Sequence, residues 1–197
     1  MYIAPNILAT EWKKLELADL ASPDWIRAVE IGRARIYGRY FDAVDLLINA
    51  EENLSPKERR YGFAILAIDC LLVETIQAFK DGIIDTRNKS KELFRKFLMN
   101  SSLFGSYFPD EKHANEFYDQ IRCGILHQGE TKKDSKVWSV GSFLQRTEHG
   151  IIVNRTEFHT KLKKEFDQYL KDLIENTDSR LRENYRKVMN HISRTKG

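Results

Sequence analysis

The stretch that decides the fold is YGFAILAIDCLLVETIQAF, residues 61–79. It is apolar almost all round, which is typical of a helix buried on every side. Asp69 and Glu74 interrupt it, so its apolar run falls short of the roughly 20 residues that a membrane span requires. The stretch therefore predicts a central core helix and no membrane anchor. The segment Ser55-Pro56-Lys57-Glu58 fits a capping box, so we expect this helix to open there and to run to about Lys80.

Apolar residues recur at helical spacing on both sides of this stretch, which predicts further amphipathic helices. These helices are expected at about residues 23–49, 89–99, 110–128 and 154–173. Between Lys136 and Val153, short β-branched and aromatic segments flank the turn Glu148-His149-Gly150, which is typical of a small hairpin. The sequence thus predicts a mainly α fold, a four- to five-helix bundle with a small β-hairpin at about 136–153, inserted before the last core helix.

The length and the charge distribution suggest how the chain is organised. A chain of 197 residues with 42% hydrophobic and 31% charged residues is typical of one globular domain. We expect residues 1–177 to form a single helical domain. Residues 178–197 carry six Lys or Arg against two acids, which predicts a basic C-terminal tail. Such a tail either stays solvated or attracts phosphate groups.

The two cysteines suggest a reducing compartment. Cys70 and Cys123 lie far apart in apolar helical contexts, which favours reduced thiols in the cytoplasm, with a bridge between them as the alternative. The first twenty residues lack the basic start and apolar stretch of a secretory signal. Because neither a CxxC pair nor an HExxH helix is present, we expect no metal and no cofactor.

The best candidate for chemistry is the segment IRCGILHQGE, residues 121–130, which contains Arg122 and His127. Histidine can accept a proton near neutral pH, and arginine can bind phosphate oxygens with two parallel hydrogen bonds. Together they suit cleavage of RNA through its own 2′-hydroxyl without a metal. The same spacing occurs at Arg186 and His191, but there the surrounding residues are mostly charged. Residues 121–126 offer more apolar support, so the first pair is preferred.

This spacing resembles the Arg-x4-6-His signature of the HEPN superfamily, helical-bundle proteins that are mostly RNA-associated and often ribonucleases. The resemblance rests on Arg122 to His127 and on a bundle from about Ser22 to Leu173. It implies a metal-independent endoribonuclease that acts as a homodimer in a toxin or antiviral defence system, with Arg122 and His127 as catalytic residues. Active members commonly carry Asn, Asp or His after the arginine, where this chain has Cys123, a weaker hydrogen-bonding partner.

Two alternatives to the nuclease remain open at this stage. The departure at Cys123 favours a non-catalytic HEPN-like module that binds RNA or a partner protein. A structural domain without affinity for nucleic acid is the other. Asp119, Cys123 and His127 share one helix face, which leaves a metal site as a minor possibility for the same segment. Without the resemblance, an arginine and a histidine at a helix end would be ordinary caps of the helix dipole.

Several other residues are candidates for supporting roles. Asp69 and Glu74 would be costly in an apolar helix without partners, so one of them, with Glu74 preferred, is expected to hold Arg122 or His127. Ordinary salt bridges or partial exposure are the alternatives. The helix expected at about residues 23–49 carries three arginines outside its apolar face. They could contact an RNA backbone or simply face water: Arg27, Arg35 and Arg39.

The remaining aromatic residues and histidines have less specific expectations. Trp138 and Phe143 in the hairpin could stack on bases, although packing against the helices is the more common use of such residues. His149 and His159 are expected to be solvated and without a role.

Overall fold

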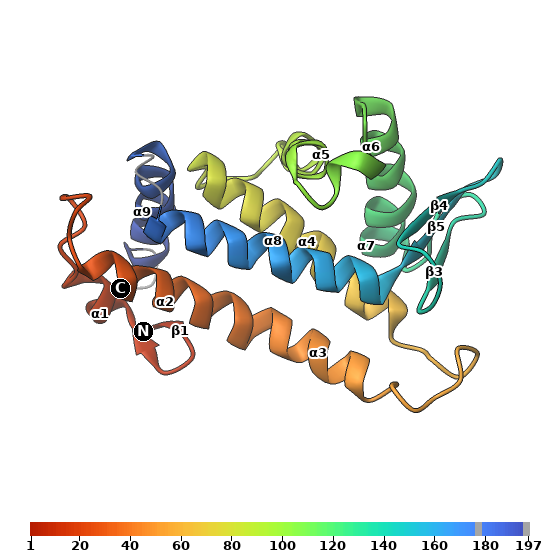
Figure 1. Cartoon of the computed structure of the whole chain (residues 1–197), viewed down its shortest axis with the longest axis horizontal. Coiled ribbons are helices and arrows are strands. Elements are labelled where there is room, and N and C mark those ends of the chain that lie inside the picture. Colours follow the sequence, from red (N-terminus) through yellow and green to blue (C-terminus); the bar gives the residue numbers. More distant parts are fainter. Residues whose placement is uncertain (176–178, 195–197) are drawn as a thin grey trace. The chain divides into compact units, whose positions relative to one another are not determined.

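The computed structural model describes residues 1–175 and 179–194. The protein is mainly helical and carries two small sheets (Figure 1), as the sequence predicts for the fold class. Where one domain over 1–177 was expected, the chain divides into two compact units, and each is described by itself. The first unit consists of Met1–Ala43, Ala78–Thr86 and Phe166–Gly197, and the second of Val44–Gln77 and Arg87–Glu165.

The first unit gathers both ends of the chain. Its elements are β1 (Tyr2–Ala4), β2 (Ile7–Leu8), α1 (Ala9–Lys13), α2 (Asp24–Ile36), the π-helix η1 (Tyr37–Phe41) and α9 (Ser179–Arg194). The two short strands pair antiparallel. Tyr185 is buried in this unit, and its hydroxyl donates to the carbonyl of Ala28 at 2.7 Å. The indole of Trp12 packs edge-on against Tyr185 and donates to Asn190 at 2.7 Å.

Helix α9 corrects the expectation of a solvated basic tail at 178–197. Residues Ser179–Arg194 form a helix, and its Tyr185, Val188 and Met189 are buried. The segment was expected to be solvated because most of its residues are charged or polar. Its few apolar residues form a narrow stripe, and that stripe is enough for one face of the helix to pack against the protein. Residues 178 and 195–197 of the expected tail lie outside the described residues.

The second unit contains the expected core helix and the hairpin region. Its elements are α3 (Asp42–Asn49), α4 (Gly62–Asp81), α5 (Ser90–Asn100), the 3-10 turn η2 (Gly105–Tyr107), α6 (Glu111–Phe117), the π-helix η3 (Tyr118–Cys123), α7 (Gly124–Gln128), β3 (Lys136–Trp138), β4 (Leu144–Arg146), β5 (Ile151–Asn154) and α8 (Arg155–Glu175). Helices α3, α4 and α8 each have residues in both units. The aromatic core of this unit includes Phe117 stacked on Phe158, with ring centroids 5.6 Å apart.

Helix α4 begins later than the sequence predicts. Ser55 and Glu58 do contact each other, with the Ser55 amide donating to Glu58 at 3.0 Å, but they close a turn and cap no helix. The helix instead starts at Gly62, because the buried Glu51 accepts the amides of Arg60 and Tyr61 and holds the preceding residues in turns. The expected start at residue 56 is therefore wrong.

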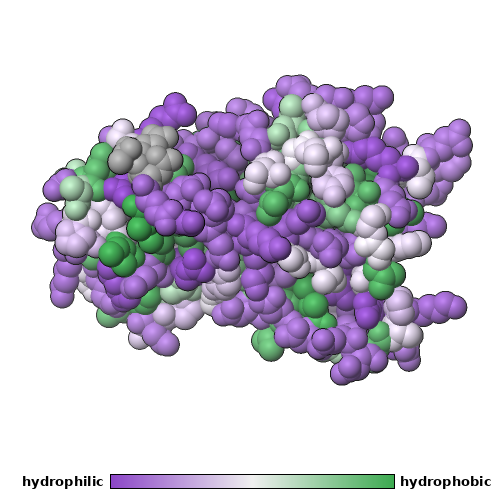
Figure 2. All heavy atoms as spheres, in the orientation of Figure 1, coloured by the Kyte–Doolittle hydropathy of each residue, from purple (hydrophilic) through white to green (hydrophobic). Residues whose placement is uncertain are grey.

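Helix α4 is also, among the described helices, the one with the length and hydropathy of a membrane span. Of its most apolar window, 61% is buried within the protein, as in the core helix of a folded domain. On the face that Figure 2 shows, hydrophilic side chains cover most of the surface and hydrophobic atoms form small patches. The burial supports the expectation of a core helix for residues 61–79.

The small sheet has one strand more than a hairpin. β4 and β5 pair antiparallel around the turn Glu148-His149-Gly150, so the predicted hairpin is present. β3 pairs parallel with the other edge of β5, which gives the order β3-β5-β4. Local turn residues signal the antiparallel pair, whereas a parallel pairing between separated strands leaves no such signal. Figure 1 shows α6 and α7 beside this sheet.

Candidate functional site

Arg122 and His127 meet at the junction of η3 and α7. Residues five apart on a regular α-helix point about 140° away from each other, because each residue turns by about 100°. Arg122 instead lies in the π-helix η3, a wider turn in which the backbone bond runs from residue i to residue i+5. The guanidinium Nη1 of Arg122 lies 3.2 Å from Nε2 of His127. Such π-turns occur frequently at functional sites.

Glu74 and Tyr118 hold the guanidinium of Arg122. Nε of Arg122 donates to Oε1 of Glu74 at 2.6 Å, and both side chains are only 12% exposed. The guanidinium also lies over the ring of Tyr118, 5.2 Å from its centroid. Burial lowers the pKa of Arg122, but the hydrogen bond and charge of Glu74 outweigh it and raise this pKa above its ordinary value. The site therefore contains a permanent, oriented cation.

The imidazole of His127 is exposed next to this cation. A guanidinium can only donate hydrogen bonds, so Nε2 of His127 is the acceptor in the 3.2 Å contact. The tautomer that fits this contact carries its hydrogen on Nδ1. The lone pair on Nε2 of His127 is thus directed at the guanidinium, and the exposed face of the pair is mainly the imidazole.

The loop after α7 fixes the end of the helix that carries the pair. Gly129 has a left-handed φ of 67° and its amide donates back to Ile125 at 3.2 Å, a common helix end. The chain then folds over Gly124, where an added Cβ would lie 2.5 Å from the carbonyl oxygen of Glu130. The amide of Lys132 donates to the carbonyl of Gln120 at 2.8 Å. These contacts leave little freedom at the helix end.

The side chains near the pair bear on two further expectations, the possible metal site and the state of the two cysteines. Asp119, a candidate for a metal site on this face, is bound to Nζ of Lys132 at 2.8 Å. Cys123 and Cys70 are both free thiols. Burial raises the pKa of Cys70 well above its ordinary value, so this thiol is not suited to act as a thiolate.

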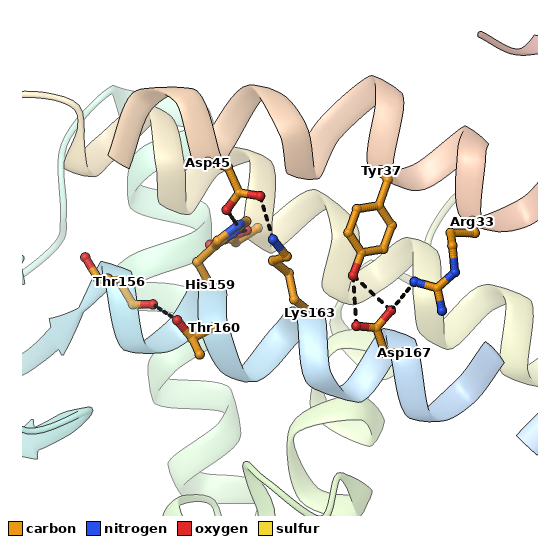
Figure 3. Close-up of polar contacts among 9 residues, drawn as sticks. Arg33, Tyr37, Asp45, Thr156, His159, Thr160, Lys163 and Asp167 are labelled. Carbon is orange, nitrogen blue, oxygen red and sulfur yellow. Dashed lines mark hydrogen bonds and ion pairs between the residues drawn. The ribbon is translucent and has the colours of Figure 1, made fainter. Parts of the chain in front are cut away.

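Asp69 does not hold Arg122 or His127. It is fully buried and accepts from Nδ1 of His159 at 2.8 Å, so the expectation that it supports the pair is wrong. His159 is only 2% exposed, which also contradicts its expected solvation. On its other side, Nε2 of His159 lies 3.2 Å from Asp45 of α3, and Lys163 binds the same carboxylate at 2.5 Å (Figure 3). A network that combines the buried pair of His159 and Asp69 with the partly exposed Asp45 and Lys163 is suited to joining helices.

The sequence contained a signal for this network. His159 precedes Leu162 by three residues and Phe166 by seven, so it lies on the apolar stripe of α8. A polar residue on an apolar stripe needs a buried partner, and Asp69 in the apolar helix α4 needs one as well.

The three arginines expected as RNA contacts belong to the first unit, where each binds acceptors within that unit. Arg27 pairs with Glu11 at 3.2 Å and with Glu30 at 3.1 Å. Arg35 donates to the carbonyl of Ile3 at 2.5 Å, and Arg39 donates to the carbonyl of Tyr2 at 3.2 Å. Their contact with RNA stays a prediction. Nearby in sequence, Arg33 and Tyr37 both bind Asp167 of α8 (Figure 3).

The second pair of the same spacing is arranged differently. Arg186 and His191 lie on α9, a regular α-helix, and Arg186 donates to the carbonyl of Leu17 at 2.8 Å. The apolar Val188 and Met189 between them are buried. This arrangement is typical of a helix that packs.

One cluster of cations was not predicted from the sequence. Four basic residues line a single cavity of the second unit: Lys57, Arg59, Arg60 and Arg155. Trp138 lines it too and is 44% exposed, whereas Phe143 is 4% exposed and packs on Phe104 and Phe158. The run of cations before the apolar helix was the available signal.

The comparisons with known proteins add no relative. No family model, curated protein or solved structure matches this chain. By its fold and site it is a mainly helical protein in which a half-buried arginine contacts an exposed histidine at a π-turn.

Proposed function

We propose that this protein is a HEPN-type, metal-independent endoribonuclease whose helices form a four- to five-helix bundle. The observation that carries the proposal is the 3.2 Å contact between Nη1 of Arg122 and Nε2 of His127 at an exposed helix end. The 2.6 Å ion pair with Glu74 supports it, because it fixes the guanidinium in advance of substrate binding.

The proposed reaction uses the RNA's own 2′-hydroxyl as nucleophile. A phosphate that binds Nη1 of Arg122 replaces His127 as the acceptor, which frees the lone pair on Nε2. His127 then takes the proton of the 2′-hydroxyl while the 2′-oxygen attacks phosphorus. The bond to the 5′-oxygen breaks, which gives a 2′,3′-cyclic phosphate and a free 5′-hydroxyl. Arg122 stabilises the negative charge that builds on the phosphoryl oxygens.

The reaction also needs a group that gives a proton to the leaving 5′-oxygen. One imidazole cannot easily serve both sides of an in-line displacement, so a homodimer would supply His127 from a second copy across a two-fold axis. Two exposed leucines support an interface here. Leu71 precedes Glu74 by three residues on α4 and is 42% exposed, and Leu126 precedes His127 and is 39% exposed.

The proposed setting follows from the sequence expectations. RNA is the proposed substrate, and a partner protein is a further candidate ligand, as in toxin and antiviral defence systems. We propose a cytoplasmic location, where the free thiols of Cys70 and Cys123 would stay reduced.

The decisive test compares the two histidines that follow an arginine at the same spacing. The change His127→Ala should lower cleavage of a single-stranded RNA by at least 100-fold, because the proton acceptor is lost. The matched change His191→Ala should leave the cleavage rate within twofold. Products are resolved on denaturing gels, and thermal unfolding confirms that both variants are folded. Equal rates in the two variants would contradict the proposal.

A second candidate is an RNA-binding module without catalysis. The closed ion pair between Arg122 and Glu74 favours it, since a guanidinium already neutralised stabilises the charge of a transition state less strongly. Cys123 beside the arginine favours it as well. This candidate predicts RNA binding that weakens with salt and yields no product. Cleavage by the wild-type protein excludes it.

A further inference from the structure

The second unit contains a cavity of about 390 Å³ between the start of α4 and β3. Its volume falls in the range of small-molecule sites. Two of the lining residues, Gly62 and Val137, pack closely against each other: a Cβ added to Gly62 would lie 2.9 Å from the Val137 side chain. Gly62 precedes Glu74 by twelve residues on α4, so the cavity lies about 18 Å along the helix from the residue that binds Arg122. The cavity is therefore separate from the arginine–histidine pair.

The charge of the cavity is positive. Its lining includes four basic residues and no acidic one. Lys57 and Arg60 are exposed at its rim, while Arg59 is held by its bond to the carbonyl of Ser139 at 3.3 Å. A lining of this composition favours an anion.

One cation of the lining has an unsatisfied donor. Arg155 is 2% exposed, and its Nη2 donates to the buried Glu51 at 2.6 Å. Its Nη1 is buried and has no hydrogen-bond partner among the described residues. An unpaired buried donor of a charged group costs free energy. An acceptor in the cavity would recover it only after the side chains that cover Nη1 move aside. Glu51 neutralises part of this cation, so the remaining positive charge comes mainly from Arg59, Arg60 and Lys57.

The cavity also offers a flat apolar surface. The indole of Trp138 is 44% exposed, whereas Trp12 and Trp25 are each 2% exposed. Phe63, Val137 and Val140 add further apolar lining. A large aromatic ring left half exposed beside cations is the usual combination for a base with its phosphate.

We propose that this cavity binds a nucleotide, with its base against Trp138 and its phosphate toward Arg60, Lys57 and Arg155. The nucleotide is either free or one unit of an RNA chain, since both carry the same base and phosphate. The binding does not depend on cleavage at Arg122, so it can be tested whether or not the protein is a nuclease.

Tryptophan fluorescence gives a direct test, because Trp138 is the most exposed of the three tryptophans and a ligand in the cavity would contact it. The probes are AMP, inorganic phosphate and a 2′-O-methylated RNA hexamer, which cannot be cut through its 2′-hydroxyl. We expect saturable quenching by AMP, by the hexamer or by both, and at least tenfold weaker binding of inorganic phosphate. Quenching by AMP identifies a free nucleotide as a ligand, and quenching by the hexamer alone identifies a unit of RNA. Calorimetry repeats each titration without relying on fluorescence.

Matched double variants test whether the cavity is responsible. Lys57→Gln with Arg60→Gln should weaken binding at least tenfold. Lys91→Gln with Lys112→Gln removes the same charge from exposed positions of the same unit and should change binding less than twofold. Trp138→Phe should abolish the quenching while calorimetry still detects weaker binding. The proposal is overturned if no nucleotide probe binds, if phosphate binds as tightly as AMP, or if both double variants bind alike.

Discussion

The spacing of an arginine followed five residues later by a histidine occurs in two helices of this protein, with different results. At the junction of η3 and α7, Arg122 and His127 touch. Both His127 and His191 are exposed, so exposure of the imidazole does not distinguish the two pairs. On α9, Arg186 donates to the carbonyl of Leu17, and the residues between it and His191 are buried. The wider turn of η3 lies at the first pair, whereas a regular α-helix carries the second. A sequence pattern therefore defines a site only together with its backbone.

The strongest test of this comparison replaces each arginine by lysine. Arg122→Lys keeps the charge but loses the two-pronged donor, so cleavage should fall about 10²- to 10³-fold. Arg186→Lys should leave cleavage within twofold. Rates are measured under single-turnover conditions with the same RNA. A comparable loss in both variants would show that spacing alone, and not the π-turn, matters.

A second test concerns the packing role of α9. Met189 lies between the residues of the second pair and is fully buried. Met189→Ala should lower the free energy of unfolding by roughly 3 kcal/mol, because it leaves a cavity. The rate of cleavage per folded molecule should not change. Urea denaturation measures the first quantity. A stable variant with reduced cleavage would assign α9 to the active site instead.

A third test addresses the rigid end of α7. In an ordinary helix, replacing glycine by alanine stabilises by up to about 1 kcal/mol. At Gly124 the added methyl group would meet the carbonyl of Glu130, so Gly124→Ala should instead destabilise by about 1–2 kcal/mol. Thermal unfolding gives the sign. Stabilisation would mean that the loop over α7 is free to move.

The smallest expected effect concerns the pH dependence of stability. It comes from Asp69, the partner of the buried His159. Burial raises the pKa of Asp69, the partner of His159, above its ordinary value. In the folded state Asp69 therefore keeps its proton at higher pH than in the unfolded state, so its contribution to stability is present at low pH and is lost as pH rises from about 4 upward.

The substitution Asp69→Asn removes this titration. The free energy of unfolding of the wild type, relative to that of the variant, should therefore decrease as pH rises through this window. Denaturation curves of both proteins between pH 4 and 7 provide the measurement. Parallel pH profiles would show that the carboxyl group of Asp69 titrates alike in the folded and unfolded states.

Much of the secondary structure could be predicted from the sequence. Residues 61–79 specify a core helix because nearly every side chain is apolar, and the β4–β5 hairpin follows from its turn. The start of α4 could not be predicted, because Glu51 competes for the amides of Arg60 and Tyr61. The candidate residues Arg122 and His127 could be selected from the sequence together with a possible partner in Glu74. The contact between Arg122 and His127 could not be predicted, since no residue pattern in the sequence indicates a π-turn.

Composition and periodicity thus determined a mainly helical protein with an arginine–histidine pair at the end of a helix. Those features depend on neighbours in the chain, whose preferences are local. Tertiary structure decided which acid holds which partner: Glu74 binds Arg122, while Asp69 binds His159. It also decided that α9 packs and that four cations surround one cavity. These outcomes depend on residues far apart in sequence, whose partners are chosen only when the chain folds and buried polar groups must be paired.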